Sequence, residues 1–259
     1  MIATAHQPAF MPWLGLLHKI ASSDVFISWD DVQAEDSGFE NRQEVYTATG
    51  RQWLTVPIRK NRELKIRELA VVNQQPWARK HWRTIELAYS GAPFWHVHSQ
   101  FLRWVYDQEW LSLVDLNGAI LDYLVVQFKI RGPRFLKLSD LKLPKPAPPA
   151  VPIPLSADQH PVAVPAHVSI ANQTIIAACR SVGANKYIFG GLGNGYADRL
   201  AFLAAGIEPM VQSYEPVPYR QMQHGVFEPR LWAFDLLLNV ERDRAIEVMV
   251  AGGRVDRMK

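Results

Sequence analysis

A histidine separates the first apolar stretch of the chain from the first helical pattern. Residues 2–5 are apolar enough for a short β-strand, which ends at His6-Gln7-Pro8, and Pro12 can begin a helix because its fixed φ suits the first turn. A histidine between a strand and a helix N-terminus can meet an anion or exchange a proton with a reacting group. We therefore interpret His6 as a candidate catalytic residue, with hydrogen bonding inside a loop as the alternative.

Two adjacent carboxylates follow the next β-rich run, which covers residues 25–29. Asp30 or Asp31 could orient the imidazole of His6 or act as a base toward an amine, and we place both among the candidate catalytic residues. A polar loop with a helix cap is the alternative. No third acidic ligand stands at a useful spacing for Mg²⁺, so no metal site is predicted.

Further polar motifs could bind an anionic substrate. Asn41 and Arg42 could hold a phosphate or carboxylate through the guanidinium. A glycine-rich turn, Gly190 to Tyr196, resembles a phosphate-cradling loop, although a tight connection explains it equally well. The remaining basic candidates are Lys60, Lys80, His81 and Lys186, and a solvated surface position is the alternative for each. Tyr219 and Gln221 belong to a loop that could line a cleft.

The first 30 residues contain the elements that would position these groups. A strand, a helix over residues 13–20 and a second strand predict a parallel βαβ unit. Ligands of such sheets bind beyond the C-terminal ends of the strands. A hairpin over 45–58 and a strand over 64–72 are expected to follow.

The rest of the chain divides into a helical part, a proline-rich part and a second α/β part. Apolar spacing predicts three helices within 76–130, and the 22 residues of 144–165 hold eight prolines, typical of a linker or surface loop. Beyond them we expect helices and strands in alternation, listed as 170–182, 186–189, 196–205, 207–213 and 229–239, with the last ten residues frayed. The prediction is an α/β fold with a mostly parallel Rossmann-like sheet. Residues 1–72 and 166–259 are expected to form its core, and residues 76–130 a helical insertion.

Composition excludes several classes of protein. The 259 residues are 48% hydrophobic and 20% charged, as in a globular domain, and the single Cys179 excludes disulfides and a cysteine-based zinc site. The net charge of +3 is too small to argue for nucleic acid. No signal-peptide pattern and no apolar run of about 18 residues are present, so we expect a cytoplasmic protein without a membrane span.

Several motifs together resemble the WbqC-like family. They are HQPAFMPWLGLLHKIASSDVFISWDDVQ, NRQ, QWLTVPI, WARKHWRTIELAYSGAPFW, ANKYIFGG and FEPRLWAFDLLLN. The resemblance covers nearly the whole chain except the proline-rich segment and the tail. Three features depart from the pattern: the longer proline-rich stretch, Asn172-Gln173 in place of a basic residue, and Val240-Glu241 in place of a glycine.

The resemblance implies a role in O-antigen or other surface-polysaccharide or specialised-metabolite biosynthesis. It implies transfer of an acyl or aminoacyl (glycyl-type) group to an amino sugar, with a nucleotide sugar and an activated acyl or aminoacyl donor as substrates. It extends the substrate-binding candidates to a set listed as Gln7, Trp13, Lys19, Gln33, Asn41, Arg42, Lys80, His81, Gly190, Tyr196, Tyr219 and Gln221. A non-catalytic binding or scaffold protein and a nucleotidyl-transfer enzyme are the alternatives. Whether the protein uses a cofactor, and which one, stays unknown from the sequence.

Overall fold

The computed structural model describes residues 1–34, 38–59, 63–146, 166–222 and 225–258. Its centre is a six-stranded sheet with the order β10-β9-β8-β1-β2-β7. The strands are β1 (Ile2–His6), β2 (Val25–Ser28), β7 (Arg134–Lys137), β8 (Lys186–Phe189), β9 (Glu208–Tyr214) and β10 (Gly253–Arg257). All neighbouring pairs are parallel except β9 with β10, so the predicted mostly parallel α/β sheet is confirmed.

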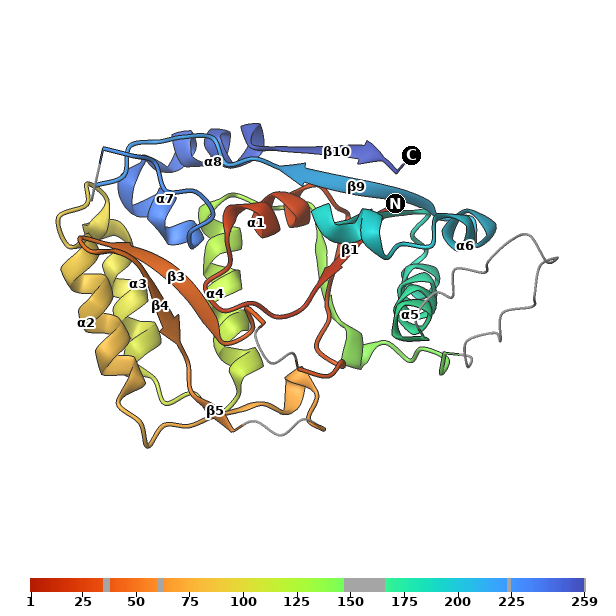
Figure 1. Ribbon diagram of the computed structural model, residues 1–259, viewed down its shortest axis with the longest axis horizontal. Coiled ribbons are helices and arrows are strands. Elements are labelled where there is room, and N and C mark those ends of the chain that lie inside the picture. The colour runs from red at the N-terminus through yellow and green to blue at the C-terminus, as the bar shows by residue number, and fades with distance from the viewer. Residues whose placement is uncertain (35–37, 60–62, 147–165, 223–224, 259) are drawn as a thin grey trace, which may run out of the picture.

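The chain leaves the middle of this sheet in two opposite directions. From β1 it proceeds to β2 and then β7, whereas from β8 on the other side of β1 it proceeds to β9 and β10. Strands β9 and β10 lie side by side along one edge of the molecule (Figure 1). The C-terminal ends of β1 and β8 therefore flank the point at which the strand order reverses. In open α/β sheets this point is where the loops diverge and leave room for a ligand.

Helices cover both faces of the sheet because its strands alternate apolar side chains between the faces. On one face α1 (Leu14–Ala21) shares a buried core with Phe26, α7 (Ala233–Asn239) and α8 (Arg242–Ala251). On the other face Val25 and Ile27 share a core with α5 (Ala166–Val182) and α6 (Arg199–Ala204). Cys179 of α5 is fully buried there, as expected for a small apolar side chain.

The helical part and a small hairpin share the α1-side core. Helices α2 (Trp77–Tyr89), α3 (Trp95–Asp107) and α4 (Leu113–Gln127) are the three that the apolar spacing predicts. The predicted hairpin is β3 (Arg42–Thr47) and β4 (Gly50–Thr55), and it forms its own two-stranded sheet. The short pieces are β5 (Ile58–Arg59), β6 (Ala70–Val71), and the 3-10 turns η1 (Ile66–Glu68), η2 (Leu138–Asp140) and η3 (Gly191–Gly195).

Two sequence predictions differ from the structure, and two of its elements, β7 and α8, were not predicted. The strand expected over 64–72 is the turn η1 followed by β6, a piece of two residues. The last ten residues are not frayed, because β10 pairs with β9 along five residue positions. Strand β7 was not predicted, since three of its four side chains are exposed and the run lacks an apolar pattern.

Some predictions fall partly or wholly outside the described residues. Of the proline-rich segment only 144–146 are described, without regular secondary structure, and Lys60 lies outside as well. The division into core, insertion and linker stays a prediction. Within the described ranges, no helix combines the length and apolarity required to cross a bilayer.

Candidate functional site

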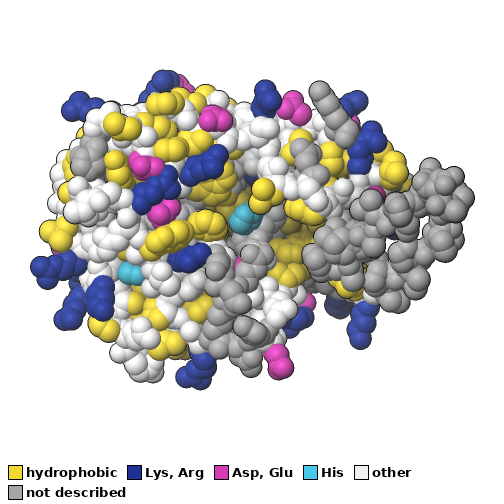
Figure 2. All heavy atoms as spheres, in the orientation of Figure 1, with side chains coloured by type: hydrophobic (Ala, Val, Ile, Leu, Met, Phe, Trp, Pro, Cys, Tyr) yellow, Lys and Arg dark blue, Asp and Glu magenta, His cyan; other side chains and the backbone are white. Residues whose placement is uncertain are grey.

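A cavity of about 810 Å³ opens at the C-terminal ends of β1 and β8, where the strand order reverses. Its lining joins residues from β1, α1, α5, β8, the glycine turn, β9 and the loop before α7. The side chains on which the following argument depends are His6, Gln7, Trp13, Lys19, Tyr196 and Arg230. Figure 2 shows hydrophobic side chains gathered near the middle of this face of the molecule, with a histidine among them.

The imidazole of His6 is fixed in one tautomer. Its Nδ1 lies 2.7 Å from the carbonyl oxygen of Gln7, which can only accept, so Nδ1 carries the hydrogen. Burial, and then the nearby charge of Lys19, lower the pKa of His6 to about 4, against a smaller opposing effect of the Gln7 carbonyl. At neutral pH His6 is therefore an uncharged imidazole whose Nε2 has a free lone pair.

Lys19 brings a buried positive charge to the same cavity. Lys19 is 5% exposed, and its Nζ donates a 2.9 Å hydrogen bond to the carbonyl oxygen of Ala5. Burial lowers the pKa of Lys19 to about 8, so the ammonium form still prevails at pH 7. Among the described residues, no carboxylate forms an ion pair with Lys19.

The backbone of Gly190 lies close to the ammonium of Lys19, because glycine has no side chain to separate them. A Cβ added to Gly190 would lie 3.9 Å from the Nζ of Lys19. On the opposite side, the Trp13 ring lies against Gly15, where a Cβ would come within 2.4 Å of the indole. Trp13 also meets Tyr214 edge to face, with ring centroids 5.4 Å apart. The cavity thus has an aromatic wall near a buried ammonium.

The charges around the cavity are of one sign. Lys19 and Arg230 line it, and no aspartate or glutamate occurs among its described lining residues. Arg230 is exposed and has a left-handed backbone with φ of 62°, which is uncommon for a residue with a side chain. A buried cation without a carboxylate is costly, and a bound anion would offset that cost. The cavity is suited to a ligand that carries a phosphate or carboxylate.

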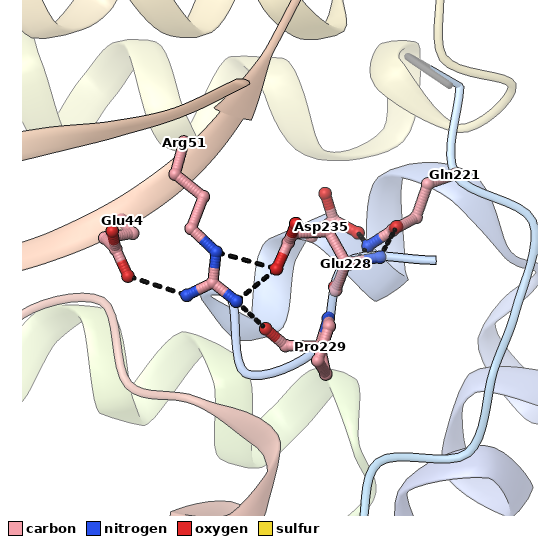
Figure 3. Close-up of polar contacts among 6 residues, drawn as sticks. All are labelled: Glu44, Arg51, Gln221, Glu228, Pro229 and Asp235. Atoms are coloured by element: carbon pink, nitrogen blue, oxygen red, sulfur yellow. Dashed lines mark hydrogen bonds and ion pairs between the residues drawn. The ribbon is translucent and has the colours of Figure 1, made fainter. Parts of the chain in front are cut away.

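A polar cluster fixes the loop that carries Arg230. Arg51 of β4 donates from Nε to Glu228, from Nη1 to Glu44 and from Nη2 to the carbonyl oxygen of Pro229, at 2.7, 2.9 and 3.0 Å (Figure 3). Gln221 exchanges hydrogen bonds with the backbone of Glu228. The guanidinium thus binds the two residues immediately before Arg230.

The same cluster continues to a buried carboxylate below the loop. Asp235 is fully buried and accepts hydrogen bonds from Tyr219, Gln221 and Tyr89 at 2.6, 2.8 and 2.8 Å. Burial raises the pKa of Asp235, and the three hydrogen bonds oppose that rise. Tyr219 and Gln221, predicted to bind substrate, hold this network and are absent from the described lining of the His6 cavity.

The structure brings six of the predicted residues to one cavity. They are His6, Gln7, Trp13, Lys19, Gly190 and Tyr196. The other predicted residues that the structure describes do not line this cavity; they follow β2 or belong to the hairpin region, α2, β8 or the loop before α7. Three lining residues that sequence reasoning did not select are Tyr187, Gln212 and Arg230. Tyr187 and Arg230 lie within motifs of the family resemblance but were not selected as site residues, and Gln212 lies in none of those motifs.

The paired aspartates do not line the cavity, and each contacts a different segment of the chain. Asp30 is 1% exposed and accepts hydrogen bonds from the backbone N–H and the hydroxyl of Ser139, at 3.0 and 2.7 Å. Asp31 pairs with Lys65 at 2.8 Å and with Arg67 at 2.6 Å. The contacts anchor the segments after β7 and around η1. A catalytic role for the two aspartates stays a prediction.

The remaining predicted binding residues are part of the hairpin region and α2. Asn41 donates to the carbonyl oxygen of Val56 at 2.8 Å, and the guanidinium of Arg42 lies 4.6 Å from the ring centre of Trp53. Gln33 forms an isolated bridge with Lys65. On α2, Lys80 is exposed and His81 is buried against Phe10, Trp77 and Tyr106. Over the described ranges, no three histidine, cysteine or acidic side chains are arranged to hold a metal ion.

Comparison with known proteins agrees with the motifs of the sequence. Residues 7–247 match the WbqC-like protein family. An uncharacterized protein of Mycobacterium tuberculosis is 30% identical over 242 residues, which cover 90% of this chain and 91% of that protein. No solved structure matches significantly. The match includes every predicted site residue except His6, which directly precedes it, and the chain belongs to the WbqC-like protein family.

Proposed function

We propose that the protein transfers an acyl or aminoacyl group from an activated, anionic donor to the amine of a sugar. The observation that carries this proposal is the neutral imidazole of His6 beside the buried ammonium of Lys19 in one cavity. Membership of the WbqC-like family is compatible with a role in polysaccharide biosynthesis. Amino sugars of such polysaccharides are a chemical class that carries the amine required.

The imidazole has the state that a general base needs. Because Nδ1–H is bound to the Gln7 carbonyl, Nε2 accepts the proton that the amine loses as its nitrogen attacks the acyl carbon. The new C–N bond forms while the bond from the acyl carbon to the leaving group breaks. The proton then passes from Nε2 to the leaving sulfur or oxygen, which returns His6 to its neutral form.

Lys19 and Arg230 bind the anionic part of the donor in this proposal. A phosphate or carboxylate next to Nζ would offset the charge of Lys19, which is one of the two causes of the low pKa of His6. Binding of the donor therefore raises the pKa of His6 toward its ordinary value and makes it a stronger base. The base is activated only when the donor is in place.

The aromatic wall gives the donor a second point of contact. Trp13 and Tyr196 both line the cavity, and a planar group can stack on such rings. A nucleotide or a pantetheine-linked nucleotide would offer both a planar base and phosphates. The proposal thus extends to donors that contain a nucleotide.

The test is a transfer assay with the purified full-length chain. Amino-sugar nucleotides are incubated with acyl and glycyl donors activated as thioesters or phosphates, and mass spectrometry detects the acylated sugar. We expect a product with the wild type and at least about a hundredfold lower rate with His6→Ala, the usual effect of removing a general base. An unchanged rate in His6→Ala would contradict the role of the imidazole, and ligand binding without any product would indicate a non-catalytic binding protein.

A further inference from the structure

A second cavity of about 530 Å³ lies on the other side of β1, at the same edge of the sheet. It is enclosed by the segment after β1, the ends of β2 and β7, and α4. Gln7 and Leu16 line both this cavity and the cavity of His6. The two cavities therefore adjoin, and Gln7, the residue directly after His6, is at the boundary between them.

The charge of the second cavity is opposite to that of the first. Asp115 and Asp122 of α4 line it, as does Asp140 of η2, whereas Lys137 is the one basic residue in its described lining. Asp115 and Asp122 are seven residues apart, which places them two turns apart on one face of the helix. The second cavity thus suits a cationic ligand, whereas the first suits an anion.

A buried hydrogen-bond acceptor in the wall of this cavity lacks a partner. Asn117 is 3% exposed and donates from Nδ2 to the carbonyl oxygen of Glu40 at 2.8 Å, while its Oδ1 has no hydrogen-bond partner among the described residues. A buried acceptor without a partner costs free energy that an N–H or O–H group of a ligand would recover. This residue points to a polar ligand independently of the aspartates.

The helix leaves space for such a ligand between the two aspartates. Gly118 of α4 lines the cavity, and a Cβ built on it would meet no other atom within 4 Å. Glycine inside a helix is unfavourable relative to alanine, so the gap at this position has a cost in stability. The open space lies on the helix that carries Asp115 and Asp122.

We infer that the second cavity binds the acceptor of the reaction, a sugar that carries a protonated amine. The ammonium lies near the carboxylates, and an N–H or O–H group is donated to Asn117. The ammonium gives its extra proton to one of these exposed carboxylates, which passes it to water, and the neutral amine nitrogen then passes Gln7 to reach His6. This inference rests on the proposed function for the identity of the ligand as an amine. It assigns the donor and the acceptor to cavities of opposite charge on the two sides of β1.

The test measures binding of glucosamine, with glucose as the uncharged probe, to the isotope-labelled full-length chain by NMR titration. We expect saturable binding of glucosamine, weaker binding of glucose, and about fivefold weaker glucosamine binding for Asp122→Asn/Asp140→Asn, as expected for two exposed charge pairs. The variant Asp107→Asn/Glu247→Gln removes two exposed carboxylates that do not line the cavity, and it should bind glucosamine as the wild type does. Gly118→Leu should also weaken binding, because its side chain would extend into the cavity from a position where an added Cβ meets no atom within 4 Å.

Two outcomes would overturn the inference: no saturable glucosamine binding, or equal dissociation constants for the wild type and Asp122→Asn/Asp140→Asn. Failure of the proposed function looks different. If glucosamine binds as expected and no donor gives a product, the acceptor site stands and the transfer reaction fails. If a product forms but Asp122→Asn/Asp140→Asn leaves KM for the amine unchanged, the reaction stands and the acceptor site fails.

Discussion

The Nζ of Lys19 donates a 2.9 Å hydrogen bond to the carbonyl oxygen of Ala5, the residue before His6. The bond holds a buried ammonium at the end of β1, where its charge helps to keep the imidazole neutral. Neither group is paired with a carboxylate among the described ion pairs. A buried cation and a neutral base at one cavity are costly for folding and suited to a reaction with an anionic donor.

Replacement of Lys19 by methionine should separate stability from anion binding. Because Lys19→Met removes a buried charge and keeps a chain of similar length, we expect a variant at least as stable as the wild type. Pyrophosphate should raise the Tm of the wild type, by an amount that corresponds to about 2.7 kcal/mol at a hundredfold excess over Kd, and should leave the variant unchanged. The wild-type effect should decline above pH 8, where Lys19 loses its proton.

The control for this prediction is Lys142→Met, which removes an exposed lysine outside the cavity lining. This variant should keep the full response to pyrophosphate. An equal response of wild type and Lys19→Met would show that the anion binds elsewhere.

The buried histidines should make folding sensitive to acid. Burial lowers the pKa of His81 to about 4, while the unfolded chain takes up the proton near the ordinary value of 6.5. The unfolded state therefore binds more protons between these values, and the free energy of unfolding decreases as the pH falls from 6.5 toward 4. His6 and His98 have pKa values of about 4 as well and act in the same direction.

Urea denaturation at pH 7 and pH 4.5 measures this effect. The loss of unfolding free energy between the two pH values should be about 2 kcal/mol smaller in His81→Phe than in the wild type. Leu87→Gln replaces an exposed, uncharged residue of the same helix and is the control, which should show the wild-type loss. Equal losses in His81→Phe and wild type would contradict a buried, neutral His81.

Arg51 should affect substrate binding although it does not line the cavity. Its guanidinium binds Glu228 and the carbonyl oxygen of Pro229, the two residues before Arg230. We expect Arg51→Ala to raise KM for the anionic substrate several-fold with little change in kcat, because the loop that carries Arg230 loses its anchor. The side chain is 35% exposed, so the loss in stability should be only about 0.5–1 kcal/mol.

A double-mutant cycle with Glu228→Ala checks this coupling. The increase in KM of Arg51→Ala/Glu228→Ala should be smaller than the product of the two single effects, since both variants remove the same contact. Arg103→Ala, which removes an exposed arginine of α3, should leave KM unchanged. Independent effects on KM would show that the ion pair does not position the loop.

The elements near the N-terminus were predictable because each had a local signal. Two short apolar runs, the helical spacing between them and Pro12 indicated β1, α1 and β2, and parallel pairing followed from the helical crossover that joins the two strands. Strand β7 escaped prediction because it is an exposed edge strand with arginine and lysine at its ends. Strand β10 escaped because Gly252 and Gly253 suggested a disordered tail, while its pairing with β9 is a tertiary contact.

Only part of the candidate site could be inferred from the sequence. His6 and Gly190 lie at the ends of predicted strands, and Lys19 lies on the helix predicted after the first strand. The reversal of strand order brings the three residues together. Arg230 reaches the cavity through a loop whose path depends on Arg51, which is far away in the sequence, and on the buried network around Asp235. The acidic cavity depends on the position of α4 beside β7, and no local pattern fixes that arrangement.

The most direct measurement of the central claim is an NMR titration of His6 in the ¹⁵N-labelled full-length protein, with and without pyrophosphate. We predict a neutral imidazole protonated at Nδ1, with a pKa of about 4 that rises when pyrophosphate binds near Lys19. His6→Ala identifies the resonance by its disappearance. An imidazole protonated at Nε2, or a pKa near 6.5 that pyrophosphate does not change, would contradict the account.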